Sequence, residues 1–235
     1  EEMQRWLLQE KRTQAWDTPV NSVDAVYAFL DGETSKLATD PSKASVLSVD
    51  GKQLTLQQTT AGLGYVKTAI AGKDCRTFTA EKSSEGTSWG AVYAQFMQPS
   101  KDVKSSASGI NVCREIIPSD RSKTQLSVGD RVKVRITITA DRDYDFVEVI
   151  DKRAACLEPI GQISGYHWGY YCAPRDNSTN YYFDCLAKGK HVVETEYYID
   201  REGEYESGTC VVQCAYSPEY SGRDSGTVIK VSSAD

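Results

Sequence analysis

Residues 132–139 read Val-Lys-Val-Arg-Ile-Thr-Ile-Thr, in which apolar and polar side chains alternate without a break. Successive side chains of a β-strand point to opposite faces, so this period of two predicts a strand with one buried and one wet face. Shorter apolar runs follow it, separated by turn residues such as Lys188-Gly189-Lys190. We expect about six or seven short strands in this half of the chain, as in an immunoglobulin-like sandwich. The other strand candidates are residues 146–150, 181–187, 191–199, 210–216 and 227–231.

Residues 33–117 also carry the pattern of strands. Asp50-Gly51 lies between the runs 46–49 and 52–56, and this dipeptide favours a hairpin with a type I′ turn. A domain boundary is expected at residues 118–123, which are polar and contain a proline. The remaining strand candidates before that boundary are residues 65–69, 76–80, 91–97 and 110–116.

Helical periodicity is confined to the first 31 residues. It occurs in residues 4–10 and 18–31, and in the second segment apolar side chains recur from Val23 at i, i+3, i+4 and i+7. Thr18 is placed as an N-cap and Pro19 as the first helical residue. The two segments predict a helical hairpin.

These patterns give a mainly β fold. We expect a helical hairpin over residues 1–32, a β-sandwich over residues 33–117 and a second, immunoglobulin-like β-sandwich over residues 118–235.

Composition excludes two classes of partner. The chain has 235 residues with 27 Lys and Arg against 33 Asp and Glu, a net charge of -6. Nucleic-acid binding needs concentrated positive charge, so we expect no nucleic-acid partner. Apolar runs stay far below the roughly 18 residues that cross a bilayer, and we expect no membrane contact by this segment. The chain begins Glu1-Glu2-Met3 inside a helical pattern, so we interpret it as a piece of a longer protein whose targeting signal lies elsewhere.

The seven cysteines do not form the spacing of a small disulfide scaffold. Cys210 and Cys214 would lie about 13 Å apart in one strand at roughly 3.3 Å per residue, so we expect no bond between them. Buried thiols, or separate partners such as Cys185, remain the two alternatives.

Catalytic and metal-binding patterns are missing from the sequence. The two histidines, His167 and His191, are too few for most hydrolase triads or for a His-rich metal site. Asp141, Asp143 and Asp145 copy the start of an EF-hand loop, but Phe146 replaces its glycine. We therefore expect a non-enzymatic protein with no catalytic residue, no cofactor and no metal.

The most unusual stretch is the aromatic loop of residues 165–171, Gly-Tyr-His-Trp-Gly-Tyr-Tyr. Aromatic side chains between glycines are typical of binding surfaces and domain contacts. The alternative is that they plug one open end of the sandwich. The candidate residues for contact with another domain or a partner are Tyr166, His167, Trp168, Tyr170 and Tyr171.

Several short motifs in the second half of the chain carry a family resemblance. They are Val128-Gly129-Asp130-Arg131-Val132, Arg153-Ala154-Ala155-Cys156-Leu157-Glu158-Pro159, Tyr182-Phe183-Asp184, Lys188-Gly189 and Gln213-Cys214-Ala215-Tyr216-Ser217-Pro218-Glu219-Tyr220. With them, residues 118–235 closely resemble the last macroglobulin-like domain of bacterial alpha-2-macroglobulin family proteins. Residues 5–30 resemble the final helices of the family's α/α-toroid. Ser88-Trp89-Gly90-Ala91-Val92-Tyr93 resembles the CUB-like β-domain that follows the toroid.

The resemblance implies a function. This chain would be the non-catalytic C-terminal segment of an endopeptidase inhibitor that entraps proteases, completing its shell and packing on the toroid. Its partners would be other domains of the parent chain and, through the full-length protein, target proteases. The parent would lie in the periplasm or cell envelope, with a lipid anchor as one option.

The family's thioester motif is not matched. Cys156-Leu157-Glu158-Pro159 imitates it, but a proline stands where the motif needs the carboxamide of Gln. We expect no thioester at Cys156.

A function from another class stays open at this point. Sugars stack their apolar faces on aromatic rings, so the loop of residues 165–171 would also suit a cell-surface adhesin or a glycan-binding β-sandwich.

Overall fold

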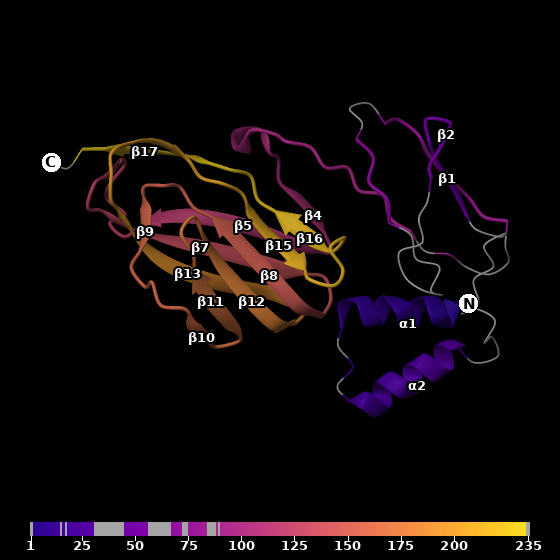
Figure 1. Ribbon diagram of the computed structural model, residues 1–235. Coiled ribbons are helices and arrows are strands. Elements are labelled where there is room, and N and C mark those ends of the chain that lie inside the picture. Colours follow the sequence, from indigo (N-terminus) through magenta and orange to yellow (C-terminus); the bar gives the residue numbers. More distant parts are fainter. Residues whose placement is uncertain are drawn as a thin grey trace. The chain divides into compact units, whose positions relative to one another are not determined.

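The computed structural model describes residues 2–14, 16, 18–30, 45–55, 67–71, 75–83, 88 and 90–233. Two compact units divide the chain: residues 18–94 form one, and residues 1–17 together with 95–235 form the other. Figure 1 gives the path of the chain and the element labels. In the described part of the chain, neither helix has the length and apolar content that a membrane-spanning helix needs.

The smaller unit contains helix α2 (Pro19–Leu30) and the strands β1 (Val46–Val49), β2 (Lys52–Gln53) and β3 (Phe78–Glu81). The three strands form an antiparallel sheet in the order β2-β1-β3. The predicted caps and turns are confirmed: the backbone N–H of Asn21 donates to Thr18 Oγ1 at 3.2 Å, and Asp50 and Gly51 have φ angles of 48° and 76°. Positive φ at both positions is what a type I′ turn requires.

Two strand predictions in this region fail. Residues 91–97 are described but form no strand, and residues 67–69 are irregular, while residues 65 and 66 lie outside the described part. Most described side chains from 91 to 97 are exposed. Their apolar content therefore marks a surface of this chain and not a buried strand.

The larger unit begins with helix α1 (Glu2–Thr13) and a short 3-10 turn, Ser100–Asp102. Its main sheet has the order β10-β11-β12-β8-β15-β16-β4-β5-β7-β13-β9. Those strands are β4 (Ser106–Ser108), β5 (Ile110–Pro118), β7 (Arg131–Ala140), β8 (Tyr144–Lys152), β9 (Leu157–Pro159), β10 (Gly165–His167), β11 (Tyr170–Pro174), β12 (Ser178–Leu186), β13 (Gly189–Ile199), β15 (Cys210–Cys214) and β16 (Ser221–Arg223). Beside it lies a smaller sheet, β14-β17-β6, made of β14 (Gly203–Glu206), β17 (Val228–Ser232) and β6 (Leu126–Ser127).

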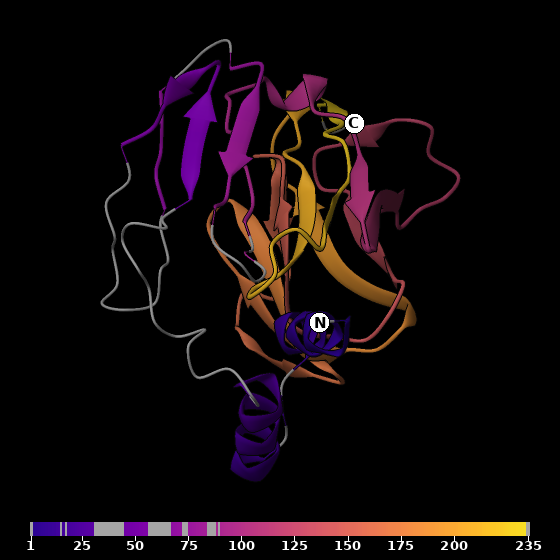
Figure 2. The same cartoon turned by 90° about the vertical axis from the view of Figure 1, so that its right-hand side faces the viewer.

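The long sheet folds over itself into two facing layers, which Figures 1 and 2 show from two sides. Strands far apart in the sheet order meet through their side chains. The hydroxyls of Thr179 on β12 and Tyr197 on β13 are 2.7 Å apart, and those of Tyr181 and Thr195 are 2.6 Å apart. The mainly β, sandwich-like fold class is thereby confirmed.

Strand β7, which contains residues 132–139, buries one of its faces, as the alternation of its side chains predicts. On β7 the side chains of Val132, Val134, Ile136 and Ile138 are buried in the main core. Their partners across the sandwich include Val147, Val149 and Tyr181 on β8 and β12. One face of β7 therefore builds the core, as the period of two indicated.

The strand pairing does not follow the domain boundary that we expected between residues 117 and 118. β5 pairs with β7 from Ile110 opposite Ala140 to Pro118 opposite Val132. A strand cannot be separated from a partner with which it shares a nine-residue register, so residues 95–117 group with the C-terminal unit.

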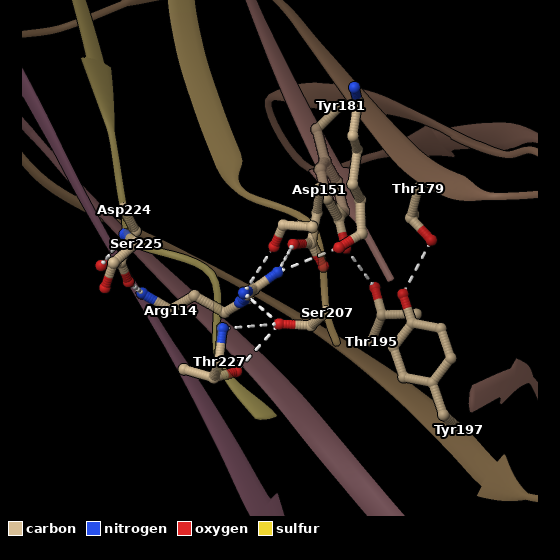
Figure 3. Close-up of polar contacts among 12 residues, drawn as sticks. Arg114, Asp151, Thr179, Tyr181, Thr195, Tyr197, Ser207, Asp224, Ser225 and Thr227 are labelled. Carbon is tan, nitrogen blue, oxygen red and sulfur yellow. Dashed lines mark hydrogen bonds and ion pairs between the residues drawn. The ribbon is translucent and has the colours of Figure 1, made fainter. Parts of the chain in front are cut away.

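A buried cation joins the two layers (Figure 3). The side chain of Arg114, on β5, is only 3% exposed, and its Nη1 donates to Asp151 Oδ1 on β8 at 2.9 Å. The same guanidinium donates to the carbonyl oxygens of Lys152 and Gly208 and to Ser207 Oγ. Burial raises the pKa of Asp151, and the Arg114 charge opposes that rise. A buried charge is tolerated only when it is hydrogen-bonded in this way.

Four of the seven cysteines are buried: Cys156, Cys172, Cys210 and Cys214. No disulfide links any of the seven, all of which lie in the described part of the chain. β15 is continuous from Cys210 to Cys214. The strand keeps the two thiols apart, as predicted. Burial raises the pKa of each of the four buried thiols.

We predict that Arg114→Met lowers the free energy of unfolding by about 3–5 kcal/mol, because Asp151 is left as a buried charge without its partner. Urea unfolding followed by far-UV circular dichroism measures the change. The control is Arg135→Met, which breaks a surface ion pair with Glu194 and should leave the midpoint close to that of the parent sequence. Equal losses in the two variants would contradict the role given to Arg114.

We also predict two classes of thiol reactivity. Iodoacetamide should label Cys75, Cys113 and Cys185, which are exposed, in the native protein. It should reach the four buried thiols only after unfolding, since alkylation needs an accessible thiolate. Peptide mass spectrometry after a short native pulse separates the classes. Rapid native labelling of Cys210 would show that the core is not packed as described.

Candidate functional site

The aromatic loop is a β-hairpin at one end of the long sheet. β10 and β11 pair antiparallel, with Tyr166 opposite Tyr171 and His167 opposite Tyr170. Trp168 and Gly169 form the turn, and Gly169 has a φ of 87°. A positive φ at the second turn position favours glycine, because a β-carbon is strained there. The hairpin thus places its five aromatic side chains on two opposite faces.

The inner face is anchored on the core. Tyr170 packs at 5.9 Å from Tyr181 and 5.5 Å from Phe183, measured between ring centroids. His167 stacks on Tyr170 at 5.1 Å with an interplanar angle of 13°. Burial raises the pKa of the Tyr170 phenol. This face fixes the hairpin to β12 and leaves little of Tyr170 for a partner.

The outer face is a row of tyrosines across three strands. Tyr166 lies 4.9 Å from Tyr171, and Tyr171 lies 6.4 Å from Tyr182 on β12. Tyr166 is 82% exposed, and Trp168 at the tip is 98% exposed. We call Tyr166, Trp168, Tyr171 and Tyr182 the aromatic ridge.

The structure therefore separates the five residues singled out in the sequence. Tyr166, Trp168 and Tyr171 lie in the ridge, whereas His167 and Tyr170 belong to the anchoring face. Tyr182 was missed, because it lies on another strand and joins the ridge only through the register of β11 with β12, where Tyr171 is opposite Tyr182. A strand register of this kind has no signal in a single sequence.

The ridge has no groups for acid–base or nucleophilic chemistry. The other histidine, His191, lies on β13, and its Nε2 is 2.7 Å from the carbonyl oxygen of Ala187. Among the described residues there is no group of three or more His, Cys, Asp or Glu side chains that could hold a metal ion. What the arrangement offers is rigid apolar area with phenol hydroxyls at its margin.

The side chains of Asp141 and Asp143, in the turn between β7 and β8, make hydrogen bonds that stabilise the turn. Tyr144 donates its hydroxyl to Asp141 Oδ1 at 2.6 Å, and the backbone N–H of Lys188 donates to Asp143 Oδ1 at 2.6 Å. Phe146 has a φ of 58°, which turns its ring outward to lie edge-on to Tyr216 at 5.2 Å. The carboxylates of Asp141 and Asp143 thus close the turn between strands.

Cys156 lies immediately before β9 and is fully buried. The backbone N–H of Asp200 donates to its carbonyl oxygen at 3.0 Å, and Pro159 is opposite Tyr197 on β13. The residues that imitate the thioester motif therefore lie at the core, where β9 pairs with β13.

Comparison with known proteins addresses the family. A family model described as the bacterial alpha-2-macroglobulin MG10 domain matches residues 109–219. The match begins next to β5 and covers most of the strands of the long sheet. A comparison with curated protein sequences gives no match.

Solved structures with a similar fold come from the same family. Trypsin-activated alpha-2-macroglobulin from Escherichia coli has a TM-score of 0.54 at 14% identity over 95% of this chain. The Escherichia coli protein activated by porcine elastase has a TM-score of 0.53 at 16% identity over 95%. A mutant of Salmonella alpha-2-macroglobulin has a TM-score of 0.51 at 16% identity over 93%.

The chain spans only 16%, 21% and 15% of the length of those three structures, respectively. At these identities the likeness concerns the fold, and the family assignment rests on the sequence match to residues 109–219. Residues 109–219 therefore form a domain of the bacterial alpha-2-macroglobulin family.

Proposed function

We propose that this chain is a non-catalytic interaction segment of a bacterial alpha-2-macroglobulin-like endopeptidase inhibitor. The observation that carries the proposal is the MG10 match, which coincides with a sandwich that exposes the aromatic side chains Tyr166 and Trp168. The similar Escherichia coli structures are of a protein activated by trypsin and by elastase. A chain with about one sixth of that protein's length would contribute to such an inhibitor through contacts with its other domains.

The aromatic ridge is the contact that we assign to this role. Tyr166 and Trp168 are exposed, yet both belong to a hairpin whose other face is fixed by Tyr170. Rigid tyrosine and tryptophan side chains bury a large apolar area at a small cost in conformational entropy, and they dominate protein interfaces for this reason. The ridge suits another domain of the same parent chain.

The remaining parts of the chain fit the same proposal. Residues 1–32 would be the end of the α/α-toroid, and residues 33 onward would form the CUB-like domain up to the MG10 domain. The protein would complete the shell around a trapped protease in the periplasm or cell envelope. Its protease partners would be met only by the full-length parent.

We predict that Tyr166→Ser combined with Trp168→Ser weakens binding of the 235-residue chain to the rest of the parent by at least about tenfold. The reason is that central aromatic residues carry most of the binding free energy of an interface. Biolayer interferometry with the two purified pieces measures the dissociation constant, and thermal unfolding should be unchanged. The control is Val192→Ser, an exposed position on β13, which should bind normally.

An unchanged dissociation constant for the double variant would contradict the proposed contact. Loss of binding to a glycan array with unchanged binding to the parent would favour the adhesin function instead.

We further predict that the chain alone inhibits neither trypsin nor elastase and takes up no methylamine. Entrapment needs a cleavable segment and a surrounding shell, and a thioester needs a carboxamide where Pro159 stands. Residual protease activity towards a protein substrate and intact mass after methylamine treatment are the two measurements. Stoichiometric inhibition, or a methylamine adduct with release of the Cys156 thiol, would refute the assignment.

A further inference from the structure

Strand β10 is one end of the long sheet, and on its outer side no strand pairs with it among the described residues. Figure 1 shows β10 at the margin of the domain, beside β11. Ile163, just before the strand, is 91% exposed, and Tyr166 within it is 82% exposed. An uncovered edge of this kind leaves backbone donors and acceptors free for another strand.

The pairing of the neighbouring strands shows which backbone groups face the free edge. In the turn between β11 and β12, the N–H of Arg175 donates to the carbonyl oxygen of Ser178 at 2.8 Å. Hydrogen-bonded and non-hydrogen-bonded pairs alternate along antiparallel strands. Counted from that turn, Tyr171 opposite Tyr182 is a hydrogen-bonded pair, so Tyr171 directs its backbone groups away from β10. Tyr166, opposite Tyr171, therefore directs its own N–H and C=O to the free edge.

Two other outer strands of this unit carry protection against strand addition. β9, at the opposite end of the long sheet, contains Glu158 and Pro159, and β14 contains Glu204 and Glu206. Charged side chains and proline on an edge disfavour pairing with another chain. Around β10, by contrast, the sequence from 159 to 174 has no Asp, Glu, Lys or Arg. The β10 edge therefore lacks the charges that protect β9 and β14.

The proposed contact of the aromatic ridge gives this edge a requirement. A domain that covers the ridge also covers the backbone of Tyr166, because this residue is part of the ridge. A buried N–H or C=O group without a hydrogen-bond partner is destabilising. A neighbouring strand supplies an acceptor and a donor at the right spacing together. The backbone of Tyr166 therefore favours an extended segment as the covering group.

We propose that an uncharged, extended segment of another domain of the parent pairs with β10 and adds a strand to the long sheet. This inference rests on the proposed function, since it gives the mode in which the ridge is bound. The segment exchanges two hydrogen bonds with Tyr166, and its side chains lie beside the ring of Tyr166 on one face and beside His167 on the other.

The chemistry of the segment follows from that of the edge. A charged side chain placed beside residues 159–174 would lose water without gaining a counter-charge, so the segment is uncharged where it pairs. β-branched and aromatic residues suit an added strand of this kind. This chain spans 16% of the length of the trypsin-activated Escherichia coli structure, so a parent of that length would have further domains to supply the segment.

Amide hydrogen exchange, resolved to single residues by electron-transfer fragmentation, tests the pairing in the 235-residue chain and in the intact parent. In the chain alone we expect little protection at Tyr166 and more at Gly165 and His167, whose N–H groups face β11. In the parent, the protection factor of Tyr166 should rise at least about tenfold, because its N–H acquires an acceptor.

A matched pair of variants isolates the backbone contact. Tyr166→Ala and Tyr166→Pro both lose the ring, but only the proline removes the N–H. That N–H faces the free edge, where a proline is tolerated by the fold. Tyr166→Pro should bind the rest of the parent about three- to tenfold more weakly than Tyr166→Ala. Biolayer interferometry measures the two dissociation constants.

A second pair tests the uncharged character of the edge. Ile163→Lys places a charge beside β10, as β14 has, and should weaken binding to the rest of the parent. Val192→Lys places the same charge at an exposed position on β13 and should bind normally. Equal binding of the two variants would contradict an uncharged segment at this edge.

Several results would overturn the proposal. One is an unchanged protection factor of Tyr166 in the parent. If the rings of Tyr166 and Trp168 are nevertheless shielded there, the ridge contact stands and side chains alone make it. Protection of Tyr166 that rises with the concentration of the chain alone would instead assign the edge to a second copy.

Equal binding of Tyr166→Pro and Tyr166→Ala would also contradict the backbone contact. If Tyr166→Pro disturbs the hairpin, which changed aromatic chemical shifts of Tyr170 and Phe183 would reveal, the protection factor of Tyr166 in the unchanged parent decides alone.

Discussion

The buried guanidinium of Arg114 is the interaction on which the sandwich depends. It reaches from β5 to Asp151 on β8, and its remaining bonds go to Ser207 and the backbone around it (Figure 3). Apolar packing attracts the two layers but does not fix their relative orientation. The hydrogen bonds of Arg114 have a fixed geometry, and they therefore define how β5 lies against β8. The same residue ties residues 95–117 to the C-terminal unit. The aromatic hairpin is attached to this frame through strand pairing, because β11 pairs with β12 and β12 pairs with β8.

The parts of the fold that could be predicted are those written in local patterns. The alternation of residues 132–139 identified β7, the Asp50-Gly51 pair identified a type I′ turn, and Thr18 identified a helix start. Each depends on the preferences of neighbouring residues, which a sequence shows directly. The strand expected at residues 91–97 was wrong, because apolar content alone does not reveal whether a segment finds a partner.

The parts that could not be predicted depend on contacts between distant residues. Arg114 lies on the buried face of β5, in line with Val112 and Ile116, and nothing local shows that Asp151 lies beside it. Tyr182 joins the aromatic ridge only through strand register. The sequence indicated the aromatic hairpin as a candidate contact, but it could not indicate Tyr182 on the neighbouring strand. The hairpin pairing places His167 and Tyr170 on the face that packs on the core. It leaves Tyr166 and Trp168 exposed.

The central claim is that the aromatic ridge of this MG10 domain is buried against another domain of its parent. Hydroxyl-radical footprinting tests it residue by residue, by comparing the 235-residue chain with the intact parent protein. We predict that Tyr166 and Trp168, which are exposed in the chain, lose most of their oxidation rate in the parent, while buried Tyr181 reacts slowly in both. Equal oxidation of Tyr166 and Trp168 in the two samples would contradict the account.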